Sequence, residues 1–205
     1  MPEVLVPPAR WERWCLNFED RHGGAVLVVV DGALRGDAAD GSTFVARLPL
    51  AQVYDGRPDA AAFAAAAAPH PAWGVLLVRK GGFAVARMAG AGIVESKVGQ
   101  RHVQGRTKAG GQSQQRFARR RGNQARAAYE AAADHAARIL GTAPVQVVTG
   151  GDRAAVAEVL ADPRLAGVAV VAPWLAVPDP RRAVLDQAIA DAQALQVTVE
   201  NAPAP

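Results

Sequence analysis

The chain contains 205 residues, of which 50% are hydrophobic, and this suffices for one domain, or one domain with a sub-lobe, around a buried core. Its formal net charge is only +4, and its single cysteine, Cys15, excludes an intramolecular disulfide framework and is typical of a reducing compartment. No signal segment opens the sequence, and the longest aliphatic run, Ala25 to Val30, is too short to span a bilayer. We therefore expect a cytoplasmic protein with no membrane partner.

Residues 1–71 are expected to form a sub-lobe packed on the main domain. After two prolines, Trp11, Trp14 and Phe18 recur at three- and four-residue spacing, which predicts a helix with one buried face. The sub-lobe is then expected to contain strands at Ala25–Asp31 and Ser42–Leu48, separated by a Gly/Asp-rich turn, and an alanine-rich helix at Asp59–Ala68.

Two groups of side chains in this sub-lobe are interpreted as structural. Cys15 lies on the apolar face of the first helix, and nothing in the sequence supplies the histidine partner or helix N-terminus that a nucleophile needs. Asp31, Asp37 and Asp40 lack the alternating ligand spacing of a calcium loop, so they are interpreted as turn residues. We expect no metal ion and no cofactor.

The order of elements from Trp73 onward predicts the fold of the main domain, residues 72–200. Three short strands are joined by turns so tight that they must form an antiparallel meander. The expected elements are strands at Trp73–Arg79, Phe83–Met88 and Gly92–Lys97, a long helix ending at Leu140, a strand at Val145–Thr149, a helix at Arg153–Ala161, a strand at Gly167–Ala172 and a helix at Arg181–Leu195. This order is RNase H-like. We therefore expect a fold of the α/β class, with helices packed on a mixed (α+β) five-stranded sheet.

Smaller features complete the expected main domain. Asp152 and Asp179 are placed as N-caps of the last two helices. Gln196–Glu200 is expected to add a short edge strand, and residues 201–205 a disordered tail. Ala132, Ala136 and Ile139 belong to the face of the long helix that should pack against the sheet.

The positive charge of the chain is concentrated in one stretch. Between Glu95 and Glu130 there are nine Lys and Arg and no Asp or Glu, so the rest of the chain is acidic. A cationic segment of this kind is typical of polyanion binding. At its middle stand Gly110, Gly111 and Gln112, and two successive glycines let a backbone approach a partner closely.

The residues after these glycines carry a family resemblance. Residues 110–121 read GGQS-x-x-RFAR-x-R, which closely resembles the catalytic loop and following helix of the middle domain of eukaryotic and archaeal class I peptide-chain release factors. More broadly, the chain is similar to bacterial, actinobacterial-type members of the Vms/release-factor-like (VLRF) family. The resemblance implies a release-factor middle-domain-like fold in which residues 98–112 form the GGQ loop.

The resemblance also implies an activity. Gly110 and Gly111 would let the loop enter the peptidyl-transferase centre, and Gln112 would act on the ester that joins the nascent peptide to tRNA. The expected function is a codon-independent peptidyl-tRNA hydrolase for ribosome rescue or quality control, monomeric off the ribosome, with the large subunit, its 23S rRNA and peptidyl-tRNA as partners. Its expected RNA-binding residues are Lys97, Arg101, His102, Arg106, Lys108, Ser113, Arg116, Arg119, Arg120, Arg121 and Arg126.

Two alternatives remain open from the sequence. One is a nuclease that cuts near the tRNA 3′ end, as the same family resemblance allows. RNase H-type nucleases hold two metal ions with carboxylates, whereas here the corresponding positions are apolar or arginine-rich, with only Glu95 and Asp152 nearby. The other alternative is a non-catalytic rRNA- or ribosome-binding module in which the GGQ segment is only a linker.

Overall fold

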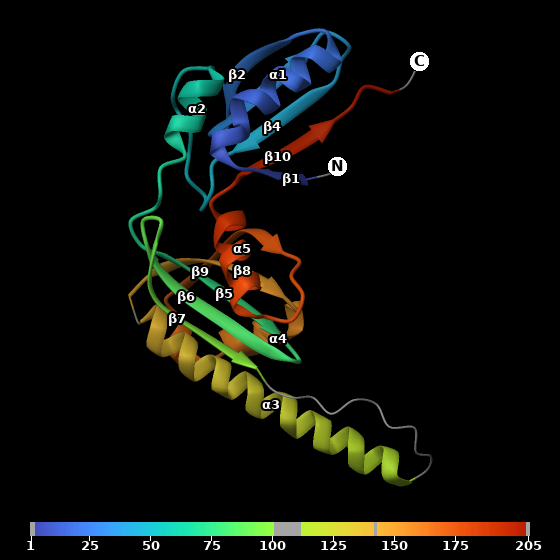
Figure 1. The fold of residues 1–205 in the computed structure, drawn as a ribbon, viewed down its shortest axis with the longest axis vertical. Helices are drawn as coiled ribbons and strands as arrows, with labels where there is room; N and C mark the ends of the chain where they lie inside the picture. The colour runs from blue at the N-terminus through green and yellow to red at the C-terminus, as the bar shows by residue number, and fades with distance from the viewer. Residues whose placement is uncertain (1–2, 101–111, 142, 204–205) are drawn as a thin grey trace. The chain divides into compact units, whose positions relative to one another are not determined.

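The computed structural model describes residues 3–100, 112–141 and 143–203, and gives only the backbone for residues 112–125. The described chain is of the mixed α/β class, with two sheets and five α-helices. It divides into two compact units: unit 1 comprises Met1–Pro69 and Ala190–Pro205, and unit 2 comprises His70–Ile189. Figure 1 shows the elements of both units along the chain.

Unit 1 contains a five-stranded antiparallel sheet in the order β1-β10-β4-β3-β2. Its elements are β1 (Glu3–Val6), the 3-10 turn η1 (Pro8–Arg10), α1 (Trp11–His22), β2 (Ala25–Val30), β3 (Ala33–Ala38), β4 (Thr43–Arg47), α2 (Ala60–Ala66) and β10 (Leu195–Glu200). Helix α1 ends where Gly23 adopts the left-handed conformation (φ 78°), and Asp59 caps α2 by accepting a hydrogen bond from the Ala62 N–H.

The core of unit 1 is aromatic. Trp11 is fully buried, stacks on Trp14 at 5.1 Å between ring centroids, and meets Phe44 edge-to-face at 5.6 Å. Cys15 lies in the same core, and burial raises the pKa of its thiol to about 12, with smaller contributions from nearby Glu19 and Glu12. A thiol in this state is protonated at neutral pH, which agrees with its interpretation as a core residue.

Unit 1 differs from expectation at the Gly/Asp-rich turn. Strand β3 occupies most of it, so Asp37 is a strand residue that pairs with Arg35, whereas Asp31 and Asp40 do lie in turns. Glycine and aspartate hid the strand, because both are rare in strands. Gly36 is required by packing, since a Cβ there would lie 2.2 Å from a ring carbon of Phe44.

The last strand also differs from expectation. The sequence predicts Gln196–Glu200 as an edge strand of the main domain within residues 72–200, but β10 lies inside the sheet of unit 1, between β1 and β4. Strand β1 itself was not expected. Residue pattern can identify a strand, but the choice of partner between segments so distant in sequence depends on tertiary packing.

Unit 2 contains the predicted mixed sheet, in the order β7-β6-β5-β8-β9. Its elements are β5 (Trp73–Arg79), β6 (Gly82–Ala89), β7 (Gly92–Gln100), α3 (Gln112–Leu140), β8 (Val145–Gly151), α4 (Arg153–Leu160), the 3-10 turn η2 (Pro163–Leu165), β9 (Val168–Leu175) and α5 (Arg182–Ala192). The meander pairs antiparallel, and β5, β8 and β9 pair parallel. The prediction of a meander on one side of β8 is therefore confirmed.

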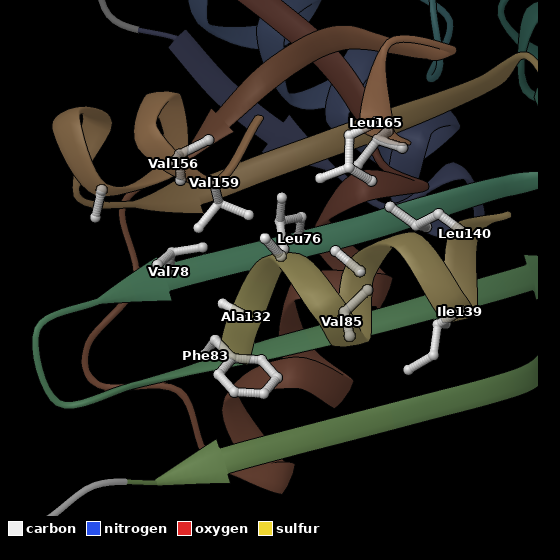
Figure 2. Packing of buried hydrophobic residues seen from close by; sticks show 14 of the residues in the cluster. Leu76, Val78, Phe83, Val85, Ala132, Ile139, Leu140, Val156, Val159 and Leu165 are labelled. Carbon is white, nitrogen blue, oxygen red and sulfur yellow. The ribbon is translucent and has the colours of Figure 1, made fainter. Parts of the chain in front are cut away.

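Helices α3 and α4 cover one face of this sheet. Figure 2 shows Ala132 and Ile139 of α3 against Val85 of β6, with Val159 of α4 close to β5. The predicted apolar face of α3 is confirmed, because Ala132, Ala136 and Ile139 are each at most 1% exposed. The ring of His135 stacks on Phe83 at 5.4 Å, so this histidine packs against the sheet.

Candidate nucleic-acid interface

Strands β5, β7, β8 and β9 all run in the same direction, so they end at one end of the sheet, which we term the carboxyl end. Strand β7 reaches it at Gln100, beside Gly82 of β6, and the basic segment follows in the sequence. The C-terminal half of α3 packs on the sheet, and its N-terminal half extends beyond the strands (Figure 1). Gln112, the last residue of the motif, therefore stands at the far end of α3.

The structure covers the predicted site residues unevenly. Arg101, His102, Arg106, Lys108, Gly110 and Gly111 lie outside the described residues. Gln112 is the first residue of α3, and Ser113, Arg116, Arg119, Arg120 and Arg121 follow on its helical backbone. The side chains of these six residues are likewise outside the description. Only Lys97 and Arg126 of the predicted set are fully described.

Lys97 and Arg126 are both exposed. Lys97 pairs across β7 and β6 with Val85, which belongs to the core under α3, so Lys97 lies on the sheet face that α3 covers. Arg126 is one turn before Tyr129, whose side chain packs against the same core. The two cations thus lie on the elements that enter and leave the basic segment.

The carboxyl end is held together by contacts between its loops. Arg79 Nη1 donates to the carbonyl oxygen of Val177 (2.7 Å), and Arg79 Nε lies 3.5 Å from an Asp179 carboxylate oxygen. The Asp152 N–H donates to the Val78 carbonyl (2.9 Å), which joins the β8–α4 turn to β5. These contacts fix the turn after β5, the start of α4 and the loop after β9 together.

The first residues of α4 also meet α3 and β9. Burial raises the pKa of Tyr129, and the nearby carboxylates of Asp152 and Glu158 raise it further. The Arg153 guanidinium lies 4.3 Å from the centre of the Trp174 ring, a cation–π contact. The start of α4 is therefore close to Tyr129 of α3 and to Trp174 of β9.

The two carboxylates considered for a metal site have structural partners. Asp152 caps α4, accepting from the N–H groups of Ala154 (2.9 Å) and Ala155 (3.2 Å), as predicted. Glu95 forms an ion pair with Arg138 of α3. Within the described parts of the chain, no three His, Cys, Asp or Glu side chains gather as a metal site would require.

One comparison with known proteins decides the family. The sequence pattern of the Actinobacteria/chloroflexi VLRF1 release factor family matches residues 71–198, more than half of the chain. The chain belongs to this family. The VLRF1 match begins where unit 2 begins and extends into β10 of unit 1, and it supports a release-factor-like role in translation. No curated protein matches the chain.

Two further observations complete the site. No helix within the described ranges is long and apolar enough to cross a membrane. The cations Lys80 and Arg153 at the carboxyl end were not among the predicted RNA-binding residues. Each of these cations closely follows the end of a predicted strand in the sequence. This position indicates a shared end of the sheet only once the two strands are known to pair in parallel.

Proposed function

We propose that this protein hydrolyses peptidyl-tRNA on the large ribosomal subunit and so releases nascent chains from stalled ribosomes without reading a codon. The family match supports the release-factor role, and the GGQS-x-x-RFAR-x-R pattern of residues 110–121 supports the chemistry. The RNase H-like element order of unit 2 agrees with the release-factor middle domain that this pattern resembles.

The observation that supports the proposal is the position of Gln112 at the start of α3. From Tyr129 back to Gln112 the helix advances about 25 Å, at the standard rise of about 1.5 Å per residue, with a diameter of about 10–12 Å. A slender helix of this length could carry Gly110, Gly111 and Gln112 into a narrow site while the sheet of unit 2 stays outside it. The arginines along its N-terminal half would meet rRNA phosphates on the way.

The start of α3 also suits the reaction. The N–H groups in the first turn of a helix have no carbonyl partner within it, and they carry the positive end of the helix dipole. Gln112 is the first described residue of α3, and its N–H would donate to the ester oxygen that gains charge in the transition state. Water then attacks the ester carbon, the bond to the ribose oxygen breaks, and that oxygen leaves with a proton as the tRNA hydroxyl.

The deciding experiment maps both products after the protein is incubated with purified ribosomes that hold peptidyl-tRNA. The proposed hydrolase yields free peptide and a tRNA whose CCA end is intact and can be charged again. A nuclease instead leaves the peptide on a short 3′ oligonucleotide, and a binding module gives neither product. Recovery of a truncated tRNA as the main product would refute hydrolysis.

A matched pair of variants tests the role of the glutamine. Gln112→Ala should slow release, though less than a change at the glycines, because the backbone donor survives the truncation. Gln115→Ala removes the same side chain one turn later in α3 and should leave the rate of release within about twofold. Equal effects of the two substitutions would show that position 112 has no special role.

A further inference from the structure

The carboxyl end of unit 2 presents cations beyond the basic segment. Lys80, Arg153 and Arg181 are exposed, and none of them forms an ion pair with a carboxylate in the described part of the chain. They come from three different connections: the β5–β6 turn, the start of α4 and the start of α5. We call these three residues the carboxyl-end cations.

Nearby carboxylates are already engaged. Asp152 accepts two hydrogen bonds as the cap of α4, and Asp179 pairs with Arg79. Glu158 is exposed but lies further along α4. Elsewhere in unit 2, Arg164 is held by both Asp134 and Asp162, and its hydrogen bonds lower the pKa of Asp162 to about 2. The carboxyl-end cations therefore keep their charge unpaired by these carboxylates, whereas the charge of Arg164 is paired.

Two of the carboxyl-end cations, Lys80 and Arg153, lie at the ends of elements that pack next to α3. Tyr129 packs against the core cluster that includes Ala155 and Val156 of α4, and Arg126 lies three residues earlier on the same side of the helix. Arg153 directly follows Asp152 and is held over the Trp174 ring. Lys80 directly follows Arg79, whose stem passes about 3.0 Å from where a Cβ on Gly151 would lie. The series from Arg126 through Arg153 to Lys80 thus crosses adjacent elements.

We infer that the carboxyl-end cations form a second RNA-binding surface, which holds the phosphate backbone of the same RNA that the basic half of α3 follows. The inference rests on the proposed function for the choice of an RNA partner. Exposed cations bind phosphates irrespective of base sequence. The arrangement of Arg153 on Trp174 limits the freedom of its side chain, so less entropy is lost when it binds a phosphate. The phosphates belong either to rRNA or to tRNA.

The test compares two charge-matched triple variants. Lys80→Ala/Arg153→Ala/Arg181→Ala removes the carboxyl-end cations, and Arg87→Ala/Arg138→Ala/Arg164→Ala removes three cations elsewhere in unit 2. Binding of each full-length protein to isolated large subunits and to free tRNA is measured from about 50 to 300 mM KCl. Each lost phosphate contact should lower the slope of log affinity against log salt by about 0.7–0.9.

For the first triple variant we expect affinity at least tenfold weaker, with the slope reduced by about 2, and for the second a change below about threefold. A loss on subunits identifies rRNA as the source of the phosphates, and a loss on tRNA identifies tRNA. Unchanged slopes on both RNAs, or equal losses in the two variants, would overturn the inference. A Lys80→Arg/Arg153→Lys/Arg181→Lys variant should restore binding, and thermal unfolding confirms that all variants fold.

The RNA-binding comparison of the variants does not depend on catalysis. Both measurements are of binding, so a wild-type protein that binds RNA with the expected salt dependence but releases no peptide refutes the proposed hydrolysis alone. Normal release and binding in the first triple variant would refute the second surface alone. The two ideas can therefore fail separately.

Discussion

The two halves of α3 have opposite compositions and contacts. From Gln112 to Arg126 the helix contains five arginines and no acidic residue, whereas from Ala127 to Leu140 it is rich in alanine and contains both acidic and basic side chains. The second half packs on the sheet of unit 2, and the first half extends beyond it. One continuous helix therefore joins a half that packs on the sheet to a half that is positively charged. Substitutions in the two halves should have different effects.

The largest expected effect lies at the start of the first half. Gly110→Ala or Gly111→Ala should reduce peptide release by about 100-fold or more, because a β-carbon restricts the backbone that the motif needs, while RNA binding stays nearly unchanged. Release from purified stalled ribosomes measures the loss. Gly122→Ala makes the same change within α3, where alanine favours the helix, and should not slow release. Release that survives both motif changes would support the linker interpretation.

The next effect concerns the packed half. Ile139→Ala should lower the free energy of unfolding by about 3 kcal/mol, because it leaves a cavity at a side chain that is 1% exposed between α3 and the sheet. Chemical denaturation measures the change. Ala131→Ser alters an exposed position of the same half and should cost less than about 0.7 kcal/mol. A small effect of Ile139→Ala would mean that this half is not packed as described.

A smaller effect is expected for charge in the first half. Arg119→Ala/Arg121→Ala should weaken binding to the large subunit about tenfold and lower the salt slope by about 1.5, with no loss of stability. Titrations at several KCl concentrations test both numbers. Arg138→Ala removes a cation that is already paired with Glu95 and should leave the slope unchanged. Equal slopes for the two variants would show that the halves do not differ in RNA contact.

The smallest effect belongs to the ion pair between the packed half and β7. Glu95→Gln should change stability by less than about 1 kcal/mol, because the side chains of Arg138 and Glu95 are 57% and 37% exposed and water screens the pair. A double-mutant cycle with Arg138→Ala isolates the interaction. A coupling energy well above this value would give the pair a larger role in holding α3 to the sheet.

Local pattern was sufficient to predict the helices and strands of unit 2. Strict periodicity identified the packed face of α3, and short turns required the meander, because neither depends on distant residues. Strand β3 was missed because Gly36 is set by contact with Phe44, which no local pattern records. The carboxyl-end cations were missed for a related reason: Lys80 and Arg153 become neighbours only through the parallel pairing of β5 and β8.

The placement of β10 has a consequence for synthesis of the protein. Strand β1 pairs with β10 alone among the described strands, and β4 needs β10 to cover one of its sides. All of unit 2 leaves the ribosome before β10 does, so it can fold while unit 1 still has an open sheet and an unpaired β1. A released chain that ends between residues 189 and 195 would therefore contain all of unit 2 and present a bare strand edge in unit 1, open to pairing with other chains.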